Sequence, residues 1–296
     1  MPELPDLAVL AEAFDPALGG RPLIVLDPVD PLVVRATPGE MAALAGQLLR
    51  TVDRRGKHLV LRLDAAEIWA TPMLTGRFQL DARGTTRPKA AARPKAAARL
   101  VLGPRRAPAR AGAEWTSGVP WLPADENEVE LRYIDSSRMG KLTVIPAGSG
   151  RVVPGAGPGE LGPDADDPAL DLDAWRSRIR RHPGELKGLL RNQAFVAGIG
   201  NAYSDEILHA ARLAPFRRRA SLAPEEVDEL YRATRATLVE AIALLRARVP
   251  PSFERQVRDH LKVHLRGGQP CPRCGTTISQ VSPGGQATSY CRGCQR

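Results

Sequence analysis

The sequence predicts a multidomain protein of the α+β class, with a strand-rich N-terminal region, a helical region and a cysteine-bearing tail in that order. Three observations predict it. Short apolar runs separated by turn residues dominate the first half of the chain. Apolar residues at helical spacing dominate the second half. All 4 cysteines lie in the last 26 of the 296 residues, a length that accommodates more than one domain.

Composition narrows the class of protein. Hydrophobic residues make up 43% of the chain, which is enough to bury a core and argues against wholesale disorder. The net charge of +9 and the isoelectric point near 9.9 favour an anionic polymer as partner, with nucleic acid foremost. The sequence has no run of about 18 apolar residues, and its first residues do not resemble a signal peptide. We therefore expect a cytoplasmic protein, as in a bacterial cytosol.

The first half begins with a predicted helix. Leu7, Leu10, Ala11 and Phe14 recur at helical spacing, and Pro5 suits a first helical turn. Short apolar or alternating runs with turn residues between them then predict strands at 23–26, 57–63, 68–70, 100–102 and 142–145.

Positive charge is concentrated in an insertion at about residues 81–112. This segment holds nine Arg or Lys residues and one Asp, and it is rich in Ala and Pro. Such a composition does not build a packed core, so most of the segment is predicted to be a mobile loop. A dedicated DNA-binding arm is the alternative.

A linker is predicted at residues 147–173, because Pro, Gly and Asp are dense there. Helices are predicted after it, at 184–191, 201–212 and 224–247, where apolar residues recur at helical spacing. The predicted organisation is an N-terminal domain of residues 1–146, the linker, a helical domain of residues 174–253 and a tail of residues 254–296.

The tail has the cysteine spacing of a zinc site. Two residues separate Cys271 from Cys274 and Cys291 from Cys294, and 16 residues lie between the pairs. Two such turns present four thiolates to one Zn²⁺ ion, and an all-cysteine set leaves no open position, so the zinc is predicted to be structural and to tie a β-hairpin. Two redox pairs are the alternative, but no thioredoxin-type βαβ pattern surrounds them. The tail carries seven basic and two acidic residues and is expected to face phosphate.

Residues 186–208 predict two helices joined by a turn. Gly198 and Gly200 lie in the turn, and Asn201 is expected to cap the second helix. The free N–H groups at such a helix start predict a phosphate site, to which Lys187 adds a cation. An ordinary helix hairpin with a capped second helix is the alternative.

The amino terminus suggests covalent chemistry. The small residue at position 2 permits removal of Met1, which leaves Pro2 as an N-terminal secondary amine. An α-amine has a reference pKa of about 8, so part of it is unprotonated at neutral pH and can attack an electrophilic sugar carbon. Glu3 lies beside it in the chain and can transfer protons.

These segments together resemble the bifunctional DNA glycosylases of the formamidopyrimidine-DNA glycosylase and endonuclease VIII family. The matching segments occur in the family's order and span nearly the whole chain: residues 1–6, 54–59, 74–78, 131–141, 187–208 and 271–294. The resemblance implies an N-terminal β-sandwich with flanking helices, a helix–two-turn–helix domain that binds DNA, and a C-terminal zinc-finger hairpin.

The resemblance also assigns roles to the residues that match the family's motifs. Pro2 matches the nucleophile that attacks C1′ of the damaged nucleotide and forms a Schiff base, and Glu3 matches the acid/base residue. Lys57 matches a phosphate-binding lysine that is important for catalysis. Lys187 and Asn201 match phosphate contacts of the helical domain.

Several positions depart from the family's pattern. Gln286 stands where the finger normally carries an arginine, which removes a charge from a phosphate contact. Ser137 and Met139 replace the residue that reads the estranged base and the intercalating aromatic, and Arg138 is the candidate to take over the first role. Leu74 stands at the void-filling position and is expected to wedge into the base stack.

The resemblance thus implies an enzyme of base-excision repair. It removes damaged bases from double-stranded DNA as a monomer, through a Schiff base on Pro2 followed by β- and δ-elimination. Two alternatives stay open. One is a damage- or abasic-site-binding protein of the same fold with impaired catalysis, and the other is a glycosylase specialised for oxidised pyrimidines or bulky alkylated bases.

Overall fold

The computed structural model of the chain describes residues 1–82, 94–110, 119–157, 160–282 and 285–296. These residues form two compact units, which are described separately. The first unit comprises Met1–Pro2, Asp6–Pro154 and Leu245–Gln256, and the second comprises Glu3–Pro5, Gly155–Leu244 and Val257–Arg296. No helix within the described part of the chain combines the length and the apolar character that a membrane crossing requires.

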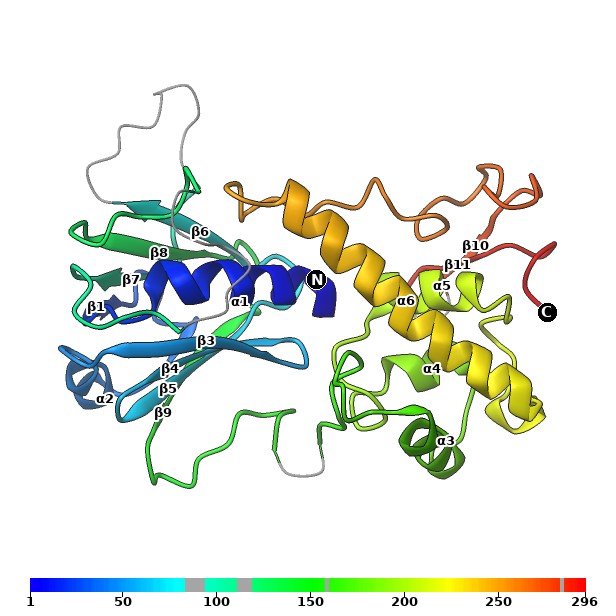
Figure 1. Ribbon diagram of the computed structural model, residues 1–296, viewed down its shortest axis with the longest axis horizontal. Coiled ribbons are helices and arrows are strands. Elements are labelled where there is room, and N and C mark those ends of the chain that lie inside the picture. Colours follow the sequence, from blue (N-terminus) through cyan, green and yellow to red (C-terminus); the bar gives the residue numbers. More distant parts are fainter. Residues whose placement is uncertain (83–93, 111–118, 158–159, 283–284) are drawn as a thin grey trace. The chain divides into compact units, whose positions relative to one another are not determined.

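The first unit is a sandwich of two sheets (Figure 1). One sheet is antiparallel and has the strand order β1 (Leu23–Asp27), β7 (Ala98–Leu102), β8 (Val129–Ile134), β6 (Arg77–Ala82). The other has the order β2 (Val34–Arg35), β9 (Lys141–Pro146), β5 (Ala66–Thr71), β4 (His58–Leu63), β3 (Leu49–Arg55), and only its β2–β9 pair is parallel. Alternate residues of β5, namely Ala66, Ile68 and Ala70, are buried, as expected for a strand with one face on a core.

All five predicted strands are confirmed, as β1, β4, β5, β7 and β9. The predicted N-terminal helix is α1 (Leu4–Leu18), and its Leu7, Leu10 and Phe14 are buried. Helix α2 (Pro38–Ala43) lies outside the predicted elements. Its start is nevertheless marked in the sequence, because Thr37 and Glu40 form a capping box.

In the described part of the basic insertion, residues 94–110, the predicted strand at 100–102 is β7 and the residues after it form no helix or strand. Strand β7 pairs with β1 on one side and β8 on the other. Three arginines of this segment bind acidic residues of the same unit: Arg99 binds Asp27, Arg105 binds Asp125, and Arg110 binds Asp15 and Asp53. Local composition counts these charges but does not reveal partners that lie far away in the chain. Residues 83–93 and 111–112 of the insertion lie outside the described residues.

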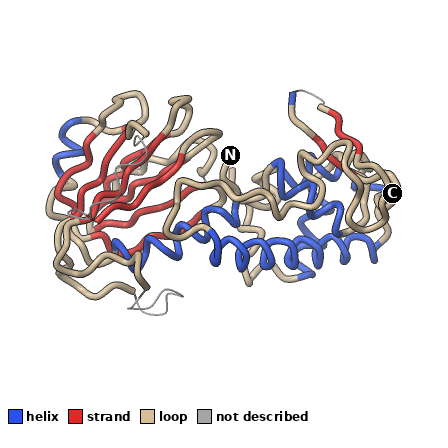
Figure 2. The backbone as a smooth tube through the Cα atoms, turned by 90° about the horizontal axis from the view of Figure 1, so that it is seen from above, coloured by secondary structure: helices blue, strands red, loops and turns tan. Residues whose placement is uncertain are grey.

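The second unit is built around helices α3 (Leu172–Arg181), α4 (Leu186–Arg191), α5 (Asn201–Ala210) and α6 (Pro224–Arg248), with a short 3₁₀ turn at Arg219–Ser221. Figure 2 distinguishes the helices of the chain, in blue, from its strands, in red. The three predicted helices are confirmed as α4, α5 and α6. Trp175 is fully buried, with its ring 5.0 Å from that of Phe195 and 5.7 Å from that of Tyr231.

The two units divide between Pro154 and Gly155, inside the predicted linker of residues 147–173, and the C-terminal part of that segment packs into the second unit. Ala165 and Leu170 are buried in the core of the second unit, and α3 begins at Leu172. Asp171 is the N-cap of α3, where its side chain accepts from the backbone N–H of Ala174. One of the acidic residues on which the linker prediction rested therefore serves to start a helix.

The tail contains the predicted β-hairpin. Strands β10 (Ser279–Val281) and β11 (Thr288–Tyr290) pair antiparallel between the two cysteine pairs. A small core lies beneath them, formed by Val263, Ile278, Cys271 and Cys291.

Candidate active site

Pro2 is buried in the first unit beside a small cavity. The cavity has a volume of about 20 Å³, and Asp6, Arg77 and Gln256 are among the residues that line it. The Nε2 of Gln256 donates to the carbonyl of Met1 at 3.2 Å, and its Oε1 accepts from Nη2 of Arg77 at 2.7 Å. Polar groups thus lie next to the residue that is predicted to carry the reactive amine.

The carboxylate of Glu3 is bound by the start of α5. Its Oε2 accepts from the N–H groups of Gly200 at 2.7 Å and Tyr203 at 3.2 Å, and its Oε1 accepts from that of Ala202 at 2.8 Å. Glu3 is only 3% exposed, so the backbone amides replace water around the charge. A helix N-terminus attracts negative charge, and here a side chain of the same protein supplies it.

Two predictions about this helix start are therefore wrong. The N-cap of α5 is Gly200, and Asn201 is the first helical residue. The N–H groups of Gly200, Ala202 and Tyr203, expected to bind phosphate, bind Glu3 instead. A Cβ atom at position 200 would lie 2.5 Å from Cδ of Glu3, so the glycine leaves room for this carboxylate.

Lys57 lies in the tight turn of the β3–β4 hairpin. Arg55 pairs with His58 across the two strands, so only Gly56 and Lys57 form the turn. Gly56 has a φ of 57°, which a glycine adopts without strain in such two-residue turns. The half-buried Lys57 is thereby held at the end of a rigid hairpin.

Leu74 and Met139 lie on two loops that hydrogen bonds tie together. Leu74 is 54% exposed between β5 and β6, and Met139 is 48% exposed between β8 and β9. The hydroxyl of Thr75 donates to Asp135 Oδ1, and it accepts from the N–H of Ser137 at 3.1 Å. Two large apolar side chains are therefore presented to solvent from a fixed frame, which suits insertion into a base stack.

Asp135 is the centre of that frame. Its carboxylate also accepts the N–H groups of Ser137 at 3.0 Å and Gly140 at 2.7 Å. Burial raises the pKa of Asp135, but hydrogen bonds from Thr75, Ser137 and Gly140 outweigh that effect and leave its pKa below the ordinary value. The charged form therefore holds the loop.

Arg138 is engaged within the first unit. Its Nε lies 2.6 Å from Oδ2 of Asp30. The backbone of Arg138 has a φ of 57°, a conformation that is sparsely populated for residues other than glycine. An Arg138 that reads a base must first exchange Asp30 for that base.

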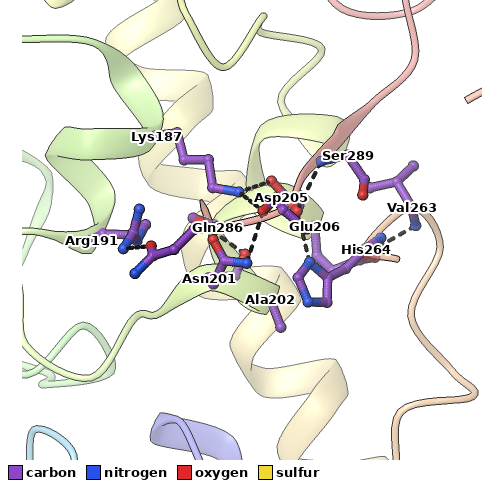
Figure 3. A network of polar contacts seen from close by, with 12 residues as sticks. Lys187, Arg191, Asn201, Ala202, Asp205, Glu206, Val263, His264, Gln286 and Ser289 are labelled. Atoms are coloured by element: carbon purple, nitrogen blue, oxygen red, sulfur yellow. Dashed lines mark hydrogen bonds and ion pairs between the residues drawn. The ribbon is translucent and has the colours of Figure 1, made fainter. Parts of the chain in front are cut away.

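Lys187 and Asn201 lie together in the second unit and donate to one carbonyl of the hairpin (Figure 3). The Nζ of Lys187 is 2.9 Å from the oxygen of Ala287, and Nδ2 of Asn201 is 2.8 Å from it. Lys187 also forms a buried ion pair of 2.7 Å with Asp205. Burial lowers the pKa of Lys187, and Asp205 offsets part of that effect. The charge of Lys187 is thus largely balanced inside the protein.

Gln286 does not lack a neighbouring cation. The Nη2 of Arg191, at the end of α4, donates to Oε1 of Gln286 (Figure 3). The guanidinium of Arg191 therefore lies where the finger was expected to lose its charge. Nothing in the local sequence identified Arg191, because its pairing with Gln286 joins residues 95 positions apart.

Two acidic residues of α5 fix the tail to the helices. Asp205 Oδ2 accepts from the N–H of Ser289 at 3.2 Å and contacts Nδ1 of His264 at 2.7 Å. Glu206 accepts the N–H groups of residues 262, 263 and 264 at 2.7 to 2.9 Å. These contacts set the position of the hairpin relative to Lys187 and Asn201.

The four tail cysteines form one cluster. The Sγ atoms of Cys271, Cys274, Cys291 and Cys294 all lie within 4.8 Å of one another. The closest approaches are 3.5 Å for Cys274 to Cys291 and 3.8 Å for Cys271 to Cys294, which fits four thiolates around one ion. This is the predicted structural Zn²⁺ site, and its four protein ligands leave no position for a substrate.

The cysteine turns dock on the end of α5. The Nε2 of His209 lies 3.3 Å from Sγ of Cys271, and Nη1 of Arg273 donates to the carbonyl of His209 at 2.7 Å. The Nε2 of Gln295 donates to the carbonyl of Leu213 at 2.9 Å. His209 is a functional candidate that the sequence pattern did not reveal, since it lies 62 residues from Cys271.

Three family models match the chain. Residues 1–142 match the formamidopyrimidine-DNA glycosylase N-terminal domain, and residues 161–249 match the H2TH domain of the same family. Residues 268–296 match a zinc finger found in FPG and IleRS.

Curated relatives match over their full length. A formamidopyrimidine-DNA glycosylase from Chloroflexus aurantiacus is 31% identical over 304 residues, which cover 100% of this chain and 98% of the relative. A formamidopyrimidine-DNA glycosylase from Heliobacterium modesticaldum is 31% identical over 305 residues, which cover 100% of both chains.

Solved structures share the fold. The crystal structure of the MutM (Fpg) protein from Thermus thermophilus has a TM-score of 0.77 at 30% identity, and the match covers 99% of this chain and 98% of that one. The Lactococcus lactis Fpg in complex with abasic-site DNA has a TM-score of 0.78 at 22% identity, with 99% of each chain covered.

A chain that matches these three domains in this order is a DNA glycosylase of base-excision repair. It belongs to the formamidopyrimidine-DNA glycosylase family, of which AP-lyase activity is characteristic.

Proposed function

We propose that this chain removes damaged bases with Pro2 as its nucleophile and then cleaves the abasic strand. The observation that carries the proposal is the burial of Pro2 beside a small, largely apolar cavity into which Asp6, Arg77 and Gln256 also reach, with the carboxylate of Glu3 fixed next along the chain. Membership of the family supports it, and so does the likeness to the Lactococcus lactis protein bound to abasic-site DNA.

The proposed chemistry begins once Met1 has been removed. The Pro2 nitrogen attacks C1′ of a flipped nucleotide, and the bond from C1′ to the base breaks as the base leaves with a proton. The nitrogen loses its own proton, and opening of the sugar ring gives an iminium. This cation takes up the electrons released when C2′ loses a proton, so the bond from C3′ to its phosphate oxygen breaks. Glu3 transfers protons in these steps.

Other residues act on DNA around the reacting sugar. Lys57, at the rigid hairpin turn, binds a phosphate. Lys187 and Asn201 bind another after they exchange the carbonyl of Ala287 for it. Leu74 and Met139 fill the space that the flipped nucleotide leaves, since both are exposed apolar side chains on tied loops. Arg138 contacts the opposite base, and Gln286 contacts a phosphate together with Arg191. The zinc holds the hairpin and takes no part in the reaction.

Borohydride trapping on abasic and lesion-bearing duplexes tests the proposal. Protein whose N-terminus is shown by mass spectrometry to begin at Pro2 should give a covalent adduct, and Pro2→Gly should give none while it still binds DNA. Tight binding of abasic DNA without any adduct from the protein that begins at Pro2 would instead identify a damage-binding protein.

A panel of lesion duplexes addresses substrate choice. Preferential excision of oxidised pyrimidines or bulky alkylated bases would identify a glycosylase specialised for those lesions. Met139 and the engaged Arg138 make the panel informative, because both lie on the loop that faces the base pair in the proposed complex.

We also propose that the chain works as a monomer in the cytoplasm. Each unit buries apolar residues of its own, and all the residues proposed to act belong to one chain. Light scattering at micromolar protein concentration tests the first statement, and fractionation of the producing cell tests the second.

A further inference from the structure

The amide of Gln256 lies close to the nitrogen that becomes the reactive amine. It donates from Nε2 to the carbonyl oxygen of Met1 at 3.2 Å. That oxygen and the Pro2 nitrogen are bonded to the same carbon, so peptide geometry places them about 2.3 Å apart. Gln256 Nε2 is therefore within about 5.5 Å of the Pro2 nitrogen, the sum of those two lengths.

Arg77 determines which end of this amide faces the chain terminus. Its Nη2 donates to Oε1 of Gln256 at 2.7 Å, and only an oxygen can accept that bond. Arg77 is held in turn, because its Nη1 donates to the carbonyls of Gly76 at 2.7 Å and Leu74 at 3.2 Å. The oxygen of Gln256 is thus engaged, and its N–H side faces the terminus.

We propose that Gln256, oriented by Arg77, is a positioning residue that keeps the Pro2 amine unprotonated once Met1 has been removed. A protonated amine donates hydrogen bonds and needs acceptors around it, whereas a neutral amine accepts through its lone pair. Gln256 presents a donor to this position, which favours the neutral, nucleophilic form. The inference rests on the proposed role of Pro2 as nucleophile.

Other charged groups near Pro2 affect the protonation of its amine, some favouring and some opposing it. Asp6 of α1, Arg77 of β6 and Arg255 after α6 line the same cavity, and Glu3 follows in the chain with its carboxylate bound by the start of α5. The two arginines oppose a positive charge on the amine, Asp6 and Glu3 favour it, and the burial of Pro2 opposes it. A change at Gln256 alone leaves these groups in place.

The pH dependence of single-turnover trapping tests the proposal. Gln256→Glu keeps an oxygen for Arg77 but turns a second acceptor toward the amine. The trapping rate of this variant should rise with pH along a profile whose midpoint lies about one pH unit higher than that of the unchanged protein. Its rate at pH 7 should therefore fall about tenfold and recover at pH 9. Gln256→Leu, which lacks the donor but adds no charge, should shift the midpoint of the pH–rate profile by less. Abasic-DNA affinity should stay unchanged in both.

Gln47→Glu is the matched control. Gln47 also donates through Nε2 to a backbone carbonyl and accepts through Oε1, but it does not line the cavity. The pH–rate profile of Gln47→Glu should coincide with that of the unchanged protein. The proposal would be overturned if the pH–rate profile of Gln256→Glu were not shifted. It would also be overturned if both Gln256 variants lost trapping rate equally at every pH. Failure of the unchanged protein to trap at every pH would overturn the proposed function itself.

Discussion

Gly200 offers a direct test of how Glu3 is held. A Cβ atom at this position would lie 2.5 Å from Cδ, 2.6 Å from Oε1 and 2.9 Å from Cγ of Glu3. Carbon atoms in contact prefer separations of about 3.5 to 4.0 Å, so Gly200→Ala must displace the carboxylate by about 1 Å. The backbone of Gly200, with φ −125° and ψ −150°, is not in the left-handed region, so the clash and not backbone strain should dominate.

The expected loss follows from the bonds that this displacement breaks. The carboxylate accepts N–H groups at 2.7, 2.8 and 3.2 Å, and a shift of about 1 Å takes such contacts beyond hydrogen-bond length. A bond to a charged group contributes about 1.5 to 3 kcal/mol, part of which water restores to a carboxylate that moves outward. Gly200→Ala should therefore lower the free energy of unfolding by about 2 to 4 kcal/mol.

Urea unfolding followed by circular dichroism measures this change. Gly188→Ala is the matched control, because Gly188 is an exposed residue inside α4 whose added Cβ would meet nothing within 4 Å. That control should gain about 0.5 to 1 kcal/mol from helix propensity. The reasoning is refuted if Gly200→Ala is as stable as the unchanged protein, or if it costs as much in a Glu3→Ala background.

Three further outcomes are expected. Asp135→Asn should lower the free energy of unfolding at pH 7 by about 2 kcal/mol, because the N–H groups of Ser137 and Gly140 lose a charged acceptor. Since the folded pKa of Asp135 is depressed, its contribution to stability is present above the unfolded value of about 3.9 and is lost as the pH falls through the folded value. The difference in stability between the two proteins should therefore narrow as the pH is lowered, and a difference that does not narrow contradicts this. Arg191→Ala should reduce the slope of log affinity for abasic DNA against log salt concentration by about 0.9, and Gln286→Arg in that background should restore the slope. An unchanged slope in Arg191→Ala would show that the contact of Arg191 with Gln286 serves only to hold the hairpin. His209→Phe should accelerate zinc transfer to a chelating dye about tenfold, because Cys271 loses a side-chain donor, whereas His209→Gln should stay closer to the unchanged protein; equal rates in all three would exclude that role.

Local patterns in the sequence predicted most elements of the fold. Helical spacing placed α1, α4, α5 and α6, and alternation placed five strands, because both patterns arise from residues a few positions apart. Helix α2 was missed although its capping box is local, since a six-residue helix offers too few turns for a periodic signal. The ion pairs of the insertion were not predicted because Asp15, an acidic partner of Arg110, lies 95 residues away in the chain.

The candidate site likewise combines features that the sequence predicted with features that only the tertiary structure shows. The spacing of the four cysteines determined the metal and its structural role, since two residues between ligands fix the geometry of each turn. The order of Met1, Pro2 and Glu3 predicted which amine is proposed to react, because removal of Met1 to leave a secondary amine depends on covalent neighbours. Only the tertiary structure decided that Glu3, and not phosphate, occupies the start of α5, across 197 residues of chain. It alone placed Asp205 against Lys187 and Arg191 against Gln286. Charges and hydrogen bonds act through space, so the balance of a charged site depends on which distant groups the fold brings within about 3 Å of it.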